Sequence, residues 1–174
     1  MELSPLTAIS AIVGRYRKQV QHLDEYFSEY ALVKYRVLVE IEYLFFLSKK
    51  GFFSLSADAI KHLTGLKNDF SVEQAAEIKQ LEATTNHDVK AVEYFLKAEL
   101  QKSGVTKETE WVHFGLTSQD VNNTAIPLLW KHAIEFEYLP ALLNLNTELK
   151  LLAKGWKDVP LLARTHGQPA SPTR

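Results

Sequence analysis

The chain has 174 residues, of which 46% are hydrophobic and 24% are charged, as is typical of a folded globular domain. Its 20 Lys and Arg residues are balanced by 21 Asp and Glu residues, and the net charge of -1 excludes the basic composition of a general nucleic-acid binder. Cysteine is absent, which excludes a disulfide framework, a thiol nucleophile and a zinc site built on cysteine.

The N-terminal segment is predicted to be an irregular lead-in that extends to about residue 15, with breaks at Pro5 and Gly14. This segment lacks the basic region and the apolar run of a signal peptide. No apolar stretch of the chain approaches the roughly 18 residues that suggest a membrane span. We therefore expect a cytoplasmic protein that does not associate with membranes.

The segment 28–50 contains neither Gly nor Pro, and we predict a helix there. A strand is the competing interpretation, because apolar and charged residues partly alternate between residues 35 and 43. Two observations favour the helix. The segment is longer than a typical strand. In addition, Ser28 is suited to cap a helix N-terminus, and two lysines followed by Gly51 are typical of a helix C-terminus.

Two further helices are predicted on either side of a polar break. The first begins at Ser71, where Gln74 completes the spacing of a capping box. The second follows Asp88 and ends at Gly104. The polar residues 84–87 between them have low helix propensity, so we expect a break or a kink there.

The C-terminal part is predicted to contain two more helices. Residues 117–120 have the pattern of a capping box, and Pro127 should kink the helix that follows unless the bend is accommodated. Pro140 suits the first turn of the next helix. That helix carries an apolar stripe typical of a coiled coil or an antiparallel bundle, formed by Leu142, Leu145, Leu149, Leu152 and Trp156. After this stripe the chain is rich in Pro, and we expect it to be irregular.

Together these elements predict an all-α fold. We expect a small N-terminal helical domain in residues 1–110 and the beginning of a central long-helix bundle in residues 111–174. The chain stops within the predicted irregular segment, at Arg174, which does not resemble a natural terminus. The sequence therefore suggests a fragment of a larger protein.

Two histidines lie in polar clusters, where functional groups concentrate. His87 has Thr, Asn and Asp neighbours, and His166 has Arg, Thr and Gln neighbours, although a capping or turn network is an alternative role for either. Thr117 and Ser118 combine hydroxyls with the free main-chain N–H groups of a helix start, as in an anion site, but an ordinary N-cap is the simpler explanation. Neither a paired-histidine metal motif nor a Gly-rich phosphate loop is present, so no metal and no cofactor are predicted.

Three segments resemble motifs of one enzyme family. They are TTNHDVKAVEY at residues 84–94, FGLTSQDVNN at 114–123 and RTHGQPA at 164–170. In this order they resemble the adenylosuccinate lyase family of the fumarase/aspartase superfamily, and the resemblance extends over essentially the whole chain. It implies a C–N lyase of purine biosynthesis, on the routes to AMP and IMP. The implied reactions release fumarate from adenylosuccinate, giving AMP, and from the succinylated ribotide SAICAR, giving AICAR.

The resemblance also implies two catalytic residues. In this β-elimination a base removes a proton next to a carboxylate, and an acid protonates the departing nitrogen. His166 matches the family's general acid, a task that suits the near-neutral pKa of histidine. His87 matches a second active-site histidine that helps to place the substrate and shares in proton transfer.

Further positions match substrate-binding residues of the family: Arg15, Tyr16, Asn86, Asp88, Thr117, Ser118, Thr165 and Gln168. Thr117 and Ser118 match the pair that binds the succinyl carboxylate. The Arg-Tyr pair at residues 15–16 matches a contact to the ribose phosphate, which a guanidinium suits. The family commonly has Pro and Asp in the turn before this pair, where the chain has Ala11 and Val13, so the phosphate-side loop departs from the family pattern.

The larger departure from the family is length. The family's chain is more than twice as long, is a homotetramer, and builds each active site from three subunits. The segment with the serine that acts as base has no counterpart here. The resemblance therefore implies an N-terminal fragment that is inactive alone. Two alternatives remain open at this point: another lyase of the superfamily, of the argininosuccinate lyase, fumarase or aspartase type, or a helical interaction module without catalysis.

Overall fold

The computed structural model describes residues 10–173, so the predicted break at Pro5 lies outside the described residues. The chain divides into two compact units, residues 1–132 and 133–174. Residues 10–16 form turns, as the predicted irregular lead-in requires. The helices that follow are α1 (Arg17–Val20), η1 (Gln21–Leu23), α2 (Asp24–Phe27), α3 (Glu29–Lys49), α4 (Ala57–Asn68), α5 (Val72–Thr85), α6 (Asp88–Lys102), η2 (Glu108–Trp111) and α7 (Ser118–Ala133).

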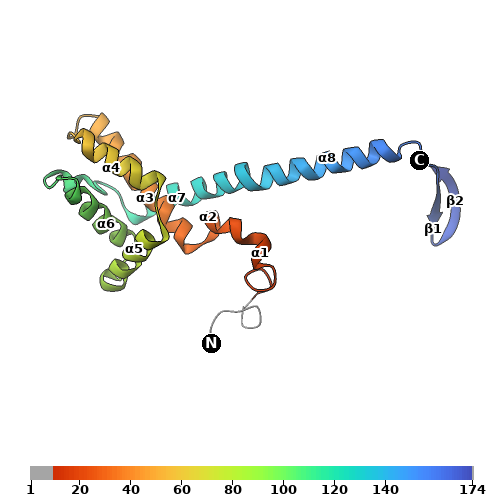
Figure 1. Cartoon of the computed structure of the whole chain (residues 1–174), viewed down its shortest axis with the longest axis horizontal. Coiled ribbons are helices and arrows are strands. Elements are labelled where there is room, and N and C mark those ends of the chain that lie inside the picture. Colours follow the sequence, from red (N-terminus) through yellow and green to blue (C-terminus); the bar gives the residue numbers. More distant parts are fainter. Residues whose placement is uncertain (1–9, 174) are drawn as a thin grey trace. The chain divides into compact units, whose positions relative to one another are not determined.

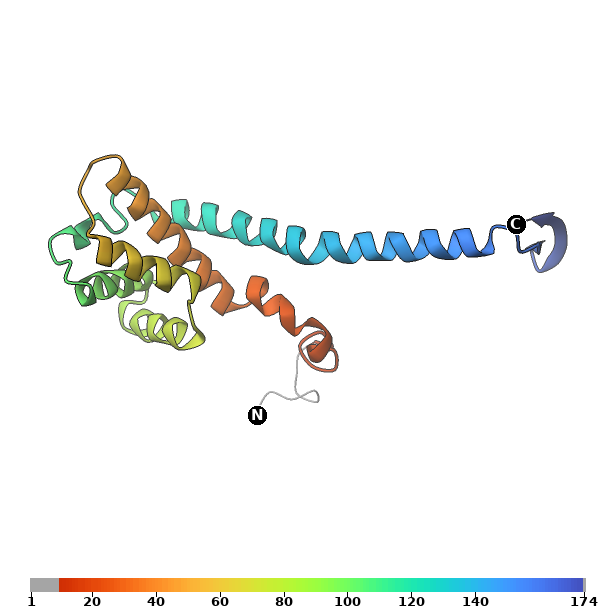
Figure 2. The same ribbon diagram turned by 45° about the horizontal axis from the view of Figure 1, so that its top comes forward.

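Helix α3 lies at the centre of the first unit, because two of its faces are buried. Helices α4, α5 and α6 pack on it, and both views show them beside it (Figure 1 and Figure 2). On this face α3 buries Val33, Val37, Ile41 and Leu44 in the main hydrophobic cluster. On the opposite face Ala31 and Tyr35 pack against residues of α7, Ala125 and Leu129. A helix enclosed in this way needs apolar residues all round, which explains its strand-like alternation.

The predicted helix boundaries in this unit are confirmed by their caps. The Ser28 hydroxyl accepts a hydrogen bond from the N–H of Ala31, at 3.1 Å. At the start of α5, Ser71 and Gln74 form a reciprocal capping box, with distances of 2.9 and 3.3 Å. The predicted break after α5 occurs at Asn86, which has φ +52° and ends the helix in the left-handed conformation.

The second unit contains a π-helical turn, η3 (Ile134–Tyr138), and helix α8 (Leu139–Trp156). Pro140 lies in the first turn of α8, as predicted. None of the residues of α8 is buried. Its predicted apolar stripe is therefore exposed, together with further leucines of the same helix such as Leu143 and Leu151.

The prediction of an irregular chain after Trp156 is wrong. Strands β1 (Leu161–Thr165) and β2 (Gln168–Thr173) form an antiparallel hairpin, in which Thr165 pairs with Gln168. The two residues between them, His166 and Gly167, have φ values of +50° and +76°. Positive φ at both central residues is the geometry of a two-residue type I′ turn, which suits the twist of a hairpin. The prolines that suggested a loop are accommodated because an isolated hairpin consists only of edge strands.

The prediction of an all-α fold is otherwise confirmed, since this small sheet is the only non-helical element between residues 10 and 173. Helix α7 continues through Pro127 to Ala133. The division into domains at residue 110 stays a prediction, whereas the compact units divide after His132. No helix in the described part of the chain is long and apolar enough to cross a membrane.

Candidate active site

His87 is held in a defined orientation at the N-terminus of α6. Its Nδ1 atom accepts a hydrogen bond from the main-chain N–H of Lys90, at 3.0 Å. Because Nδ1 is an acceptor, the neutral ring carries its proton on Nε2. Nε2 lies 3.4 Å from the hydroxyl oxygen of Ser118, at the start of α7. The fold thus brings together two predicted site residues that are 31 positions apart in the chain.

Thr117 directly precedes Ser118 and the start of α7, and its hydrogen bonds run to a side chain in the first turn of that helix. Its main-chain N–H and its hydroxyl both donate to one carboxylate oxygen of Asp120, each at 2.7 Å. The N–H of Thr117, followed by its hydroxyl, lowers the pKa of the Asp120 carboxyl. The predicted anion site at this helix start is therefore partly occupied by the chain's own carboxylate. A bound carboxylate would compete with Asp120 for the donors of Thr117.

Asp88, which is half-exposed, forms an ion pair with a buried residue that the sequence analysis did not select. Its Oδ2 atom lies 2.6 Å from the guanidinium of Arg36, a side chain that is only 5% exposed. The Nε–H of Arg36 donates to the side-chain oxygen of Asn122, at 2.9 Å. Burial acts to raise the pKa of the Asp88 carboxyl. However, the N–H of Val89 and the charge of Arg36 outweigh it and hold this pKa below its ordinary value.

Glu40 of α3 and His113 form a second pair. His113 lies in the loop that precedes Thr117 and Ser118 at the start of α7. Nδ1 of His113 contacts Oε1 of Glu40, which is 1% exposed. Among the described residues, the other carboxylate oxygen of Glu40 is buried and has no hydrogen-bond partner. Burial, which outweighs the contact with His113, raises the pKa of Glu40. His113 itself has φ +61°, an uncommon conformation for a residue other than glycine.

Arg15 and Tyr16 lie in the turns before α1. The guanidinium of Arg15 lies 5.7 Å from the ring centre of Tyr16, in a cation–π contact, and both side chains are exposed. Within residues 10–173, neither side chain has a hydrogen bond or ion pair with the residues around His87. These two predicted phosphate contacts are therefore close to each other but are not joined to the His87 group.

The remaining predicted site residues lie in the second unit, on the hairpin. His166 occupies the turn, and Thr165 and Gln168 are the cross-strand pair on either side of it. All three are exposed. The hairpin therefore gathers them at its tip.

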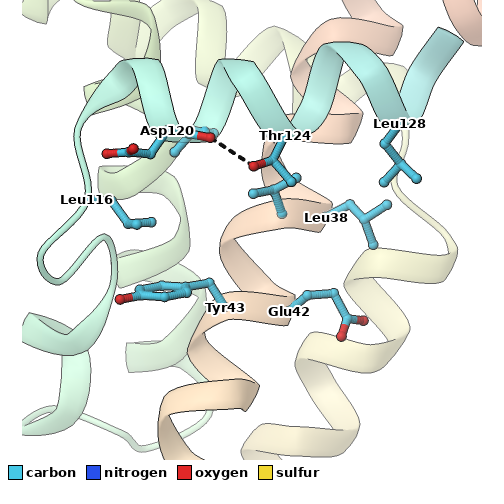
Figure 3. A pocket seen from close by; sticks show the side chains of 9 residues that line it. Leu38, Glu42, Tyr43, Leu116, Asp120, Thr124 and Leu128 are labelled. Carbon is cyan, nitrogen blue, oxygen red and sulfur yellow. Dashed lines mark hydrogen bonds between the residues drawn. The ribbon is translucent and has the colours of Figure 1, made fainter. Parts of the chain in front are cut away.

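In the first unit, an apolar hollow lies between α3 and α7 (Figure 3). It has a volume of about 390 Å³ and is lined by Leu38, Val39, Glu42, Tyr43, Leu116, Asp120, Val121, Thr124 and Leu128. Within it the Thr124 hydroxyl donates to the main-chain oxygen of Asp120, at 2.9 Å. Its lining includes neither His87 nor Ser118, so the candidate site lies outside it. No group of three or more His, Asp or Glu residues within the described range is arranged to hold a metal ion.

The sequence analysis missed Arg36, Glu40 and His113. The sequence does contain a feature that could have identified Arg36 and Glu40. Both are charged residues within the apolar segment, free of Gly and Pro, that forms α3. A charged side chain in a buried helix needs a partner. The partner itself was not identifiable, since it lies more than 50 residues away in each ion pair. Asn122 belongs to the motif at residues 114–123, but no role was predicted for it.

Comparison with known proteins agrees with the resemblance found in the motifs. The adenylosuccinate lyase of Dictyostelium discoideum is 54% identical over 99% of this chain. Those of Escherichia coli (strain K12) and Legionella pneumophila (strain Corby) are 46% and 42% identical over the same share. The chain spans about 39% of the length of each of these curated relatives. A family described as Lyase matches residues 14–174. Because this match covers nearly all of the chain, the chain belongs to the lyase family.

Proposed function

We propose that the chain works as part of a longer adenylosuccinate lyase, which eliminates fumarate from adenylosuccinate and from SAICAR. The observation that carries the proposal is the approach of His87 and Ser118, because these residues belong to two separate motifs of the family resemblance. An interaction module without catalysis would have no need for a histidine nitrogen beside a hydroxyl at a helix start. The similarity to adenylosuccinate lyases over 99% of the chain supports the choice among the lyases of the superfamily.

In this proposal His87 acts mainly as a hydrogen-bond donor. Its Nδ1 is engaged by the N–H of Lys90, so Nε2–H is the group available to a substrate oxygen or nitrogen. Ser118 and Thr117 bind the succinyl carboxylate beside it. Negative charge develops next to that carboxylate as the proton leaves, and donors placed beforehand stabilise it. Asn86 and Asp88 contact the substrate on the other side of His87.

His166 is the proposed general acid. It would protonate the departing nitrogen, and it lies in an exposed turn. Thr165 and Gln168 line the same wall of the site. Arg15 and Tyr16 contact the phosphate, for which a bidentate guanidinium is suited. His166 of the hairpin and His87, which caps α6, are proposed to come together in the assembled enzyme, with segments from different subunits.

The same proposal covers assembly and location. We infer a homotetramer for the full-length protein, which the exposed apolar face of α8 supports. We infer cytoplasmic location, which suits a cysteine-free metabolic enzyme. The relatives are about 2.5 times as long, given the 39% that the chain spans, so we expect the 174-residue chain by itself to be inactive.

A lyase assay on the complete protein tests the proposed function. Ultraviolet absorbance follows adenylosuccinate in one series, and fumarate release follows argininosuccinate in another. Turnover of adenylosuccinate alone is the expected result. Turnover of argininosuccinate alone would keep the lyase family and contradict the purine substrate. No turnover of either would favour a helical interaction module, and the polar clusters would then be caps and turns.

A further inference from the structure

We propose that Arg36, Glu40 and Tyr43, on one face of α3, position the two segments that carry His87 and Ser118. We call these three residues the α3 ridge. They are spaced by four and three residues and therefore share one side of the helix. The inference rests on the proposed function for its catalytic meaning, but its structural part concerns this chain alone.

Arg36 connects the ridge to both segments at once. Its guanidinium pairs with Asp88 in the first turn of α6, and its Nε–H donates to Asn122 in α7. Asp88 directly follows His87 in the chain, and Asn122 lies one turn after Ser118. A planar, forked side chain can hold two acceptors in fixed directions, which a lysine cannot do. The single Arg36 side chain thus sets the separation of the two helix starts.

The other two residues of the ridge hold the loop that leads into α7. Glu40 contacts the ring of His113, and the Tyr43 hydroxyl donates to the main-chain oxygen of Phe114, at 3.0 Å. Within the loop, the N–H of Leu116 donates to the oxygen of His113, at 3.2 Å. Thr117 and Ser118 follow immediately. The loop is therefore anchored to α3 at two successive residues before it reaches the candidate site.

The charge of Arg36 also bears on the protonation of His87. One oxygen of Asp88 lies 3.8 Å from Nδ1 of His87, and Arg36 compensates the charge of this carboxylate. Without that compensation the carboxylate would attract a proton to Nδ1. Nδ1–H would then repel the N–H of Lys90, and Nε2 would lose its proton and its role as donor. Arg36 is thus a positioning residue that also maintains the tautomer of His87.

Long-range proton–nitrogen NMR of the histidine rings tests this in the 174-residue chain. We expect His87 to be protonated on Nε2 at neutral pH in the wild type, and on Nδ1 in a substantial fraction of R36Q molecules. R36K keeps the charge and should restore most of the wild-type spectrum. Lys97→Met is the matched control, because Lys97 lies on α6, as Asp88 does, and forms ion pairs with Glu93 of α6 and Glu110 of η2. It should leave the His87 spectrum unchanged.

Activity of the complete protein provides the second measurement. R36Q should lower kcat about 10- to 100-fold, as expected for a displaced active-site group, with partial recovery in R36K. If the wild type does not turn over adenylosuccinate, the proposed function is wrong. The NMR spectrum of His87 then remains the test of whether Arg36 positions His87.

Tyr43→Phe keeps the proposal testable if R36Q does not fold, because it removes a single hydroxyl from a half-buried residue. The loss of one hydrogen bond should accelerate amide exchange at Leu116 roughly 2- to 10-fold. Folded R36Q with the wild-type His87 tautomer would overturn the role of Arg36. Unchanged exchange at Leu116 in Tyr43→Phe would overturn the anchoring of the loop.

Discussion

Two buried charged side chains of α3 differ in how their charge is compensated. Arg36 has both a carboxylate and an amide oxygen within hydrogen-bond distance. Glu40 has only the ring of His113 at one oxygen, and its other oxygen is unpaired. Removing a charge from water costs several kcal/mol unless partners replace the lost hydration. Burial therefore raises the pKa of the Glu40 carboxyl.

The raised pKa of Glu40 predicts a pH effect on stability. A carboxyl with a raised pKa contributes stability below its ordinary value of 4.5, and this contribution is lost as the pH rises through its folded value. Glu40→Gln mimics the protonated form and can still accept from His113. We expect Glu40→Gln to become more stable relative to the wild type, in unfolding free energy, as the pH rises from about 4 to 8. Urea titrations measure it.

Glu93→Gln is the control with the opposite sign. Burial acts to raise the pKa of Glu93, but its bonds to Lys90 and Lys97 outweigh this and lower the pKa. Its contribution is therefore present above the ordinary value and lost as the pH falls, so Glu93→Gln should destabilise most near neutral pH. A constant difference between Glu40→Gln and wild type across the range would contradict the raised pKa of Glu40.

The turn conformation of His166 makes asparagine the most informative substitution there. Asn tolerates positive φ better than Ala, so His166→Asn should keep the hairpin while it removes the proposed acid. We expect kcat of the complete protein to fall about 10²- to 10⁴-fold, the usual contribution of general acid catalysis. Ser171→Ala, on β2 of the same hairpin, serves as control. A His166→Asn variant within a few-fold of wild type would remove His166 from this role.

At the scale of elements, helix caps define where each candidate residue lies. The αL conformation of Asn86 ends α5 and the imidazole of His87 caps α6, so the short link between them directs the His87 ring. A side chain that caps a helix satisfies N–H groups that otherwise have no partner. The alternative that the sequence left open, a capping role, is therefore correct for His87. It is compatible with a functional role, because capping engages only Nδ1.

The capping box of α5 predicts a measurable loss of stability. Ser71→Ala removes the acceptor for the N–H of Gln74 and disrupts the reciprocal bond. We expect a loss of about 1 kcal/mol in unfolding free energy. Ser54→Ala, in the exposed loop before α4, should change stability by less than about 0.5 kcal/mol. Equal losses in both variants, measured by urea unfolding, would contradict the capping role.

At the scale of the whole molecule, the two units differ in how they bury apolar residues. The first unit encloses its core between α3 and the surrounding helices. The second unit leaves the stripe of α8 exposed over its whole length, including Leu145 and Leu149. Burying one leucine side chain contributes roughly 1.5–3 kcal/mol, so an exposed stripe of this length favours association.

We therefore predict that the chain self-associates through α8. Replacing both Leu145 and Leu149 with Glu should shift the sedimentation equilibrium toward the monomer, because charges are costly to bury in such an interface. Thr147→Glu places a single negative charge on the other side of the helix and should leave association unchanged. Equal association of the double variant and the wild type would contradict an interface on this face.

The helical class and the main helix boundaries could be predicted from the chain, because caps, breakers and apolar periodicity act within a few residues. The family resemblance rested on the three motifs at residues 84–94, 114–123 and 164–170. Helix α3 was predicted correctly against a strand-like pattern, since its length and caps are local properties. The hairpin was missed because a His-Gly turn is a weaker signal than the prolines around it. The pairing of Arg36 with Asp88 and the approach of Ser118 to His87 became evident only in the folded chain. These contacts join residues far apart in the chain, and packing of α3, α6 and α7 selects them from many equivalent charges and hydroxyls.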